Sequence, residues 1–287
     1  MKTGICTTDL PVMPAEELFA KLERYGIETV QFHFGSVAES GFSPDNALEI
    51  PAAIDAELVA LVRRCAERHR VAIKAVNGIF NMAHPDASVR QEGLRRLEGL
   101  ARAVSGLGCG YITLCSGTRN TLSPWDGHPD NGSAQAWDDM MQTVSAAART
   151  AERFGLVLAV ETEAGNIVDT PEKARLMMDT AGSPNLKMIM DCANLFHPGQ
   201  ARREKVRGIL RHAFEVFGPD VVIAHGKDIQ EGDGIEFCAT GEGIIDYPYF
   251  IQLLREYRYS GDMFLHSIYD EAKLPGALRY ISGLSEP

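Results

Sequence analysis

LVLAVE at residues 156–161 and LKMIMD at residues 186–191 are short apolar runs that each end on a carboxylate. Two later runs, VVIAH at 221–225 and DMFLH at 262–266, each end on a histidine. Successive runs lie roughly 30 to 40 residues apart, about the length of one strand–helix–strand unit. The pattern predicts four parallel strands in consecutive units, with their polar ends on one rim of a barrel.

The alternation of apolar runs with amphipathic stretches continues over the rest of the chain. Further strands are expected at Thr3–Thr7, Thr29–Phe34, Val71–Val76 and Tyr111–Cys115. Helices are expected at Pro14–Tyr25, Asp55–His69, Ser88–Leu107, Ala134–Phe154, Pro171–Ala181, Arg203–Phe217, Pro248–Tyr257 and Leu274–Leu284. The α/β pattern therefore predicts a (β/α)8 TIM barrel as a single domain over residues 1–287. An open doubly wound sheet is disfavoured, because no G-x-G-x-x-G loop follows the first strand.

Two helix starts carry recognisable capping chemistry. Thr170-Pro171 places an N-cap residue before a proline at the first helical position. The sequence Ser88-Val89-Arg90-Gln91 matches a capping box, in which Ser88 would be the N-cap. Both patterns predict that a helix begins at the point where the apolar periodicity begins.

Three of the predicted strands are followed by long polar segments. These segments are Asn77–Asp86, Ser116–Ser133 and Gly226–Asp246. They are βα loops and therefore belong to the barrel face on which enzymes of this architecture do their chemistry. The connections on the opposite face are short, so the long loops mark an active-site rim.

The bulk composition excludes several classes of protein. A net charge of −11 argues against nucleic-acid binding, which needs a basic face. No apolar run reaches the length of a membrane helix, and residues 1–4 lead directly into a strand without a signal peptide. Cysteines are scattered without any C-x-x-C pair, at Cys6, Cys65, Cys109, Cys115, Cys192 and Cys238. Free thiols are typical of the reducing cytoplasm, so a cytoplasmic location is expected.

The four strand-end residues form a candidate ligand set for a divalent metal ion. On a closed barrel Glu161, Asp191, His225 and His266 converge at one rim. Carboxylate and imidazole ligands suit manganese, our preferred choice, and also magnesium, cobalt or zinc. No cysteine is expected in register with this set, so a thiolate ligand is not predicted. Such an ion can hold two adjacent substrate oxygens and stabilise an enediolate.

Four motifs carry a family resemblance. They are V-E-T-E at 160–163, M-D-C-A-N-L-F at 190–196, A-H-G-K-D at 224–228 and G-E-G-I-I-D-Y at 241–247. With these motifs the chain resembles the sugar phosphate isomerase/epimerase family, the xylose isomerase-like TIM barrels, over nearly its whole length. The resemblance implies a small carbohydrate substrate and Glu161, Asp191 and His225 as metal ligands.

The chain departs from the family pattern at two positions. Family epimerases have a second glutamate at the end of the last strand, where this chain has His266. The D-x-x-H motif after the sixth strand reads Asp191-Cys192-Ala193-Asn194, so an asparagine replaces the histidine that contacts the substrate. An asparagine can donate a hydrogen bond but cannot deliver a proton. The two-glutamate mechanism of the family therefore does not transfer directly.

Other polar residues near the rim are candidates for catalysis and substrate binding. Glu163 points to the same side as Glu161 if the strand continues, and Lys227 follows His225 closely, so both are candidate catalytic groups beside Glu161. Each also has a purely structural alternative, as a group that orients a ligand or as a solvated loop residue. The candidates for substrate binding are Asn194, His84, Asn166, Asp228 and Trp125.

Three functions are open on the sequence alone. The leading hypothesis is a metal-dependent isomerase or epimerase of a keto sugar or related polyol, acting through an enediolate. The second is a metal-dependent lyase or dehydratase on a keto cyclitol or keto sugar, which the absence of the second glutamate also suits. The third is a ligand-binding barrel without catalysis. Assembly into a homo-oligomer is compatible with each of them.

Overall fold

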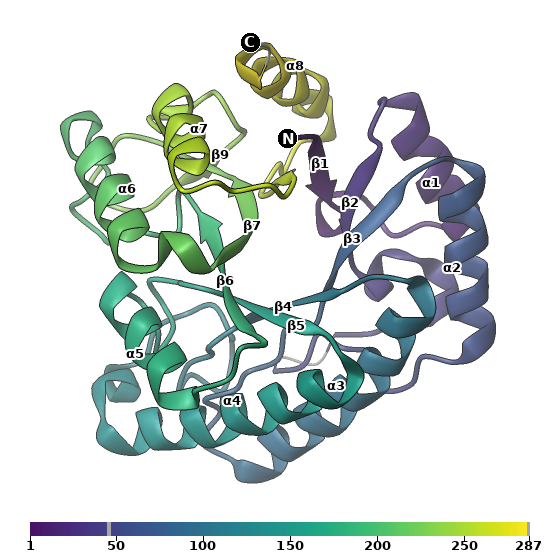
Figure 1. Cartoon of the computed structure of the whole chain (residues 1–287), viewed down its shortest axis with the longest axis horizontal. Helices are drawn as coiled ribbons and strands as arrows, with labels where there is room; N and C mark the ends of the chain where they lie inside the picture. Colours follow the sequence, from purple (N-terminus) through teal and green to yellow (C-terminus); the bar gives the residue numbers. More distant parts are fainter. Residues whose placement is uncertain (45–46, 286–287) are drawn as a thin grey trace.

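Parallel strands close into an eight-stranded barrel in this computed structural model, which describes residues 1–44 and 47–285 (Figure 1). The strands follow chain order around the barrel, and the last pairs with the first to close it. They are β1 (Thr3–Cys6), β2 (Thr29–Phe32), β3 (Ala72–Asn77), β4 (Tyr111–Cys115), β5 (Val157–Glu161), β6 (Leu186–Asp191), β7 (Val221–Gly226) and β10 (Met263–Leu265). The prediction of a single-domain (β/α)8 barrel is confirmed.

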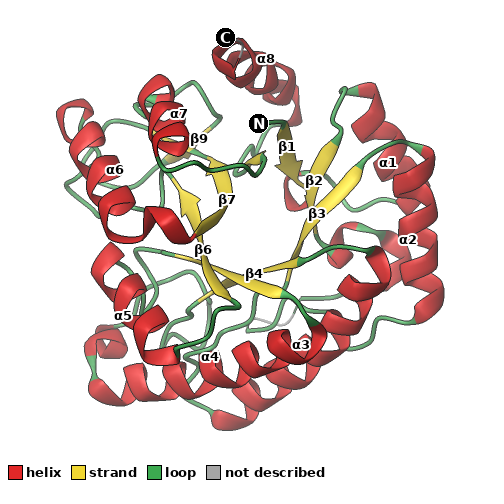
Figure 2. Cartoon of the chain, in the orientation of Figure 1, coloured by secondary structure: helices red, strands yellow, loops and turns green. Residues whose placement is uncertain are grey.

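Helices surround the barrel as an outer ring (Figure 2). They are α1 (Ala15–Arg24), α2 (Ala56–Arg68), α3 (Ala87–Leu107), α4 (Ala134–Phe154), α5 (Pro171–Ala181), α6 (Arg203–Phe217), α7 (Tyr247–Glu256) and α8 (Leu274–Ser285). Their bounds agree with the expected ones to within one residue at each end. Among the described residues no helix combines the length and apolarity needed to cross a membrane.

The structure differs from expectation in one loop and at one helix start. The loop after β7 contains a short antiparallel ribbon, β8 (Asp228–Ile229) paired with β9 (Phe237–Cys238). The prediction of a capping box with Ser88 as the N-cap is wrong. Asp86 is the N-cap of α3, and its carboxylate accepts the Ser88 N–H at 2.8 Å. The aspartate is two residues earlier and its carboxylate is the stronger acceptor. At α5 the predicted cap is confirmed, since Thr170 accepts the Lys173 N–H.

The barrel interior explains how the strands position their polar ends. A small apolar cluster fills the lumen and consists of Cys6, Ala75, Ala159, Ile189, Ile223 and Phe264. Successive side chains of a strand alternate between its two faces, so a residue two positions later points to the same side. Glu161 follows Ala159, Asp191 follows Ile189 and His225 follows Ile223 at that spacing. The same alternation that buries the lumen residues therefore carries these three polar side chains to its open end.

Candidate metal centre

Glu161, Asp191 and His225 meet at the carboxyl ends of β5, β6 and β7. One ligand atom from each lies within 4.8 Å of the other two. His225 Nδ1 is 3.5 Å from Glu161 Oε1 and 3.5 Å from Asp191 Oδ2. All three side chains are buried. The β6–β7 register pairs Asp191 directly with His225, so two of the three groups are cross-strand neighbours.

Two atoms of this cluster have no hydrogen-bond partner among the described residues. They are Asp191 Oδ2 and His225 Nδ1, both buried. Leaving a buried acceptor unpaired costs about 1–3 kcal/mol, so such atoms need a ligand. The Nε2–H of His225 can donate to Gln31 Oε1 at 2.9 Å, which leaves Nδ1 as the ring nitrogen that faces the carboxylates. This donor set of carboxylate oxygens and one imidazole nitrogen fits a divalent metal ion.

Asn194 connects the cluster to two further candidate residues. Its Nδ2 donates to Glu161 Oε1 at 2.6 Å and to Glu163 Oε1 at 2.8 Å. Its Oδ1 accepts from Lys227 Nζ at 2.7 Å. The Lys227 ammonium also lies 3.7 Å from the centroid of the Phe237 ring, where the π face stabilises a cation. Both ends of the Asn194 amide are thus occupied by contacts within the protein.

The electrostatic environment separates the protonation states of these groups. Burial is the largest influence on Glu163 and raises the pKa of its carboxyl to about 7, although the Lys227 ammonium opposes it. Burial disfavours the charged form of Lys227, but the carboxylates of Asp191, Glu163 and Glu161 outweigh it and raise the pKa of the ammonium. Lys227 therefore stays charged near neutral pH, where Glu163 can gain or lose a proton.

His266 lies beside this cluster and has a different partner. Among the described residues it belongs to neither group of side chains with converging metal-ligand atoms. Its Nδ1 is 3.3 Å from Asp9 Oδ1, in the turn after β1. Its ring centroid is 5.6 Å from that of His225. At the position where family epimerases have a glutamate, this chain has an imidazole paired with a carboxylate from another strand end.

Two candidates for substrate binding instead hold rim loops in place. The Asp228 carboxylate accepts N–H groups from the loop after β7, namely those of Ile229, Gly241, Gly243 and Ile245. Asn166 accepts the Gly117 N–H at 2.7 Å and donates to the Pro124 carbonyl at 3.1 Å. Trp125, which follows Pro124 in the sequence, is 40% exposed, so its indole is available to a bound molecule.

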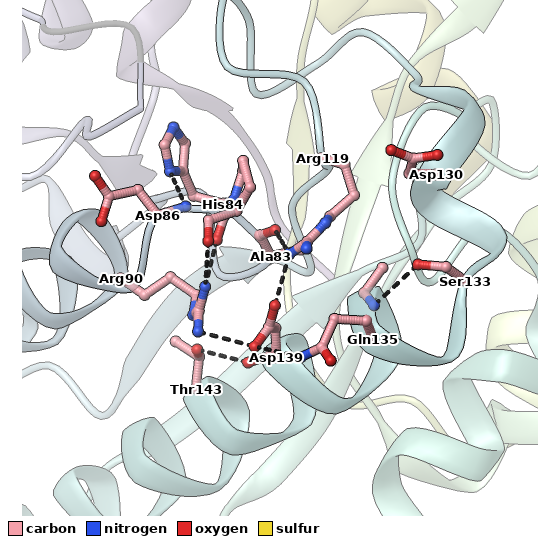
Figure 3. A network of polar contacts seen from close by, with 12 residues as sticks. Ala83, His84, Asp86, Arg90, Arg119, Asp130, Ser133, Gln135, Asp139 and Thr143 are labelled. Carbon is pink, nitrogen blue, oxygen red and sulfur yellow. Dashed lines mark hydrogen bonds and ion pairs between the residues drawn. The ribbon is translucent and has the colours of Figure 1, made fainter.

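His84 belongs to a network that anchors the loops after β3 and β4 (Figure 3). Its Nδ1 accepts the Asp86 N–H at 3.1 Å, and its carbonyl accepts from the Arg90 guanidinium. Arg90 and Arg119 both pair with the buried Asp139 carboxylate, at 3.0 and 2.8 Å. The ion pairs tie these loops to α4.

Sequence reasoning missed two residues at the site. Gln31 on β2 contacts His225, and its signal was the alternation of polar and apolar residues over 29–34, which places Gln31 on the same strand face as Thr29 and His33. The expectation that no cysteine lies in register is wrong, because the β4–β5 register pairs Cys115 with Glu161. The sulfur of Cys115 and the carboxylates of Glu161 and Glu163 form a second group whose ligand atoms lie within 4.8 Å of one another. The sequence feature that could have identified Cys115 was its place at the end of a predicted strand.

The sequence matches the family described as xylose isomerase-like TIM barrel over residues 19–283. No curated protein matches it. Solved structures with the same architecture include a D-tagatose 3-epimerase-like protein, with a TM-score of 0.76, 15% identity and coverage of 99% of this chain and 97% of that one.

Two further structures carry different descriptions. A probable 3-DHS dehydratase from Bacillus anthracis has a TM-score of 0.73 and 15% identity, covering 98% of this chain and 99% of its own. The IolI protein with a bound zinc atom has a TM-score of 0.72 and 16% identity, covering 99% and 96%. At these identities the likeness shows a shared fold, and the activities belong to those proteins.

Proposed function

This chain belongs to the xylose isomerase-like TIM barrel family, and we propose that it is a divalent-metal-dependent isomerase or epimerase of a keto sugar or related polyol. The observation that carries the proposal is a pair of buried atoms, Asp191 Oδ2 and His225 Nδ1, which face Glu161 and have no hydrogen-bond partner among the described residues. These three residues would hold the ion, with manganese preferred over magnesium, cobalt or zinc. When bound, the ion supplies a Lewis acid for the carbonyl and the adjacent oxygen of the substrate.

Glu163 and Glu161 are the candidate bases in this proposal. A base removes a proton from the carbon next to the carbonyl and returns it to the neighbouring carbon or to the opposite face. One amide nitrogen, Asn194 Nδ2, holds both carboxylates, so both approach a bound substrate from the same side. Transfer on one side suits isomerisation better than epimerisation, which needs acids or bases on both faces. The Lys227 ammonium supplies positive charge, or a proton, to a substrate oxygen nearby.

The lyase alternative gains support from His266. A dehydratase needs one strong base and an acid for the leaving group, but no second glutamate. His266 pairs with Asp9, and an imidazolium in that position can protonate a departing hydroxyl. An enone absorbance that develops with a keto cyclitol or keto sugar would identify this reaction.

Substrate class, location and assembly extend this proposal. A small carbohydrate agrees with the names of two structural neighbours, which describe an epimerase-like protein and a probable dehydratase. Cytoplasmic location and a homo-oligomeric state remain predictions from the sequence. A barrel that binds ligands without catalysis remains the alternative if no proton transfer is found.

Solvent exchange tests the proposed reaction. The purified protein, supplied with Mn²⁺, is incubated in heavy water with a panel of ketoses and keto acids, and deuterium in the sugar is measured by mass spectrometry. We expect incorporation at the carbon next to the carbonyl. The variant Glu163→Gln keeps the shape of the side chain but removes the base, and its exchange should fall by about 100-fold or more. Absence of exchange with every compound would contradict the proposed proton transfer through an enediolate.

A further inference from the structure

We propose that Cys115, Glu161 and Glu163 form a second cation site, which shares Glu161 with the first and takes a thiophilic divalent ion such as Zn²⁺. This inference goes beyond the proposed function, because it does not depend on which reaction the chain catalyses. It rests on the position of a buried cysteine that faces two carboxylates.

The geometry brings three ligand atoms together. Cys115 Sγ and one oxygen from each of Glu161 and Glu163 all lie within 4.8 Å of one another. Cys115 ends β4 and pairs with Glu161 across the β4–β5 ladder, so the backbone holds two of the three ligands in register. The Cys115 side chain is only 2% exposed, and its thiol makes no hydrogen bond to any residue that the structure describes. A buried sulfur without a partner is thus directed at two carboxylates.

Hydrogen bonding leaves ligand atoms available on both carboxylates. Asn194 Nδ2 holds Oε1 of Glu161 and Oε1 of Glu163. No residue that the structure describes donates a hydrogen bond to Oε2 of either group. A carboxylate can bind one ion through each oxygen, so Glu161 can serve both sites as a bridge.

The donor set selects the kind of ion. Thiolate ligands favour Zn²⁺ and similar soft ions, whereas Mn²⁺ and Mg²⁺ prefer oxygen and nitrogen. On binding, the Cys115 thiol releases its proton to solvent and the sulfur forms the metal bond, with no change of oxidation state. Three anionic ligands offset the charge of the ion and of the nearby Lys227 ammonium. An ion held here would also bind Glu163 and so withdraw it from the proton transfer proposed above.

Cobalt provides the direct test, because a cysteine thiolate bound to Co²⁺ gives a sulfur-to-metal charge-transfer band in the near ultraviolet. We expect the full chain to bind about two Co²⁺ ions and to show this band. The variant Cys115→Ser should bind about one ion and lose the band. Glu163→Gln should still bind both ions, but its affinity for the second Co²⁺ ion should fall by at least about tenfold. The matched control is Cys109→Ser, since Cys109 is also buried but donates to the Lys74 carbonyl away from the site.

The outcome separates this inference from the metal centre itself. Asp191→Asn should weaken the first site and keep the charge-transfer band, because Asp191 contributes only to the first group. A band that persists in Cys115→Ser, or binding of a single ion by the unmodified chain, would overturn the second site and leave the first intact. If a variant loses the first site but keeps the charge-transfer band, the second site is supported. That result would hold even if the proposed reaction were not observed.

Discussion

His225 uses its two ring nitrogens for different tasks. Nε2 contacts Gln31 Oε1 at 2.9 Å, and Nδ1 faces the carboxylates of Glu161 and Asp191 at 3.5 Å each. An acceptor on one nitrogen fixes the tautomer and leaves the other as a metal ligand. A glutamine on β2, far from β7 in sequence, thus determines which atom of His225 faces the site.

Replacing Gln31 with alanine should weaken metal binding. Without its acceptor the His225 ring loses its tautomer preference and orientation, and affinity for Mn²⁺ should fall about 10- to 100-fold. Isothermal titration calorimetry of the variant measures this change. Gln31→Glu retains an acceptor at the same place and should bind Mn²⁺ at least as tightly as the unmodified chain. If Gln31→Ala bound Mn²⁺ as tightly as the unmodified chain, Gln31 would have no role in orienting His225 for metal binding.

His33, near the end of β2, should make the protein sensitive to acid. Burial holds the pKa of its imidazole at about 4, below the ordinary value of 6.5. A lowered pKa means that the unfolded chain binds the proton more tightly, so stability is present above pH 6.5 and is lost as the pH falls towards 4. The loss attributable to His33 is at most about 3 to 4 kcal/mol.

Denaturant unfolding at several pH values checks this expectation. The free energy of unfolding of the unmodified chain should fall more steeply between pH 6.5 and pH 4 than that of His33→Gln, which cannot titrate. Comparing the two chains cancels the contribution of every other group. Parallel pH profiles would show that His33 is not held neutral by burial.

At the scale of elements, Asp139 on α4 connects two rim loops to the helical shell (Figure 3). Its carboxylate pairs with Arg90 from α3 and with Arg119 from the loop after β4. Removing one member of a buried ionic group leaves uncompensated charge in the interior. Asp139→Ala should therefore destabilise the protein by about 3 kcal/mol and loosen residues 77–86 and 116–133.

Hydrogen exchange and denaturant unfolding measure both effects. Asp138→Ala is the matched control, because Asp138 is the preceding residue of the same helix and is exposed. It should change the free energy of unfolding by less than about 0.5 kcal/mol. If Asp139→Ala behaves like the control in both measurements, the network does not position these loops.

At the scale of the whole molecule, repetition made the architecture predictable from sequence. Eight strand–helix units carry the same apolar periodicity, and the rim position of Glu161, Asp191 and His225 follows from strand alternation. Contacts between distant units were not predictable in this way. The pairing of His266 with Asp9 and the proximity of Gln31 to His225 depend on barrel closure and side-chain rotamers. Neither barrel closure nor side-chain rotamers can be read from local patterns in the sequence.

The register of β4 against β5 illustrates the same limit. Strand ends are the least certain part of a sequence-based prediction, and a shift of one residue would turn Cys115 away from Glu161. The observed ladder pairs them directly and so brings a thiol to the site, contrary to the expectation that no cysteine lies in register there. The ribbon β8–β9 was also missed, because its strands are only two residues long.

The central claim is that Asp191, with Glu161 and His225, binds a divalent metal ion, and Mn²⁺ calorimetry tests it most directly. Mn²⁺ is the suitable probe because it avoids thiolate ligands. The unmodified chain should bind one Mn²⁺ at this site, and Asp191→Asn should weaken that binding by at least about 100-fold. Asp138→Asn, the same chemical change on an exposed surface, should have no effect. Unchanged Mn²⁺ affinity in Asp191→Asn, or no binding by the unmodified chain, would contradict the account.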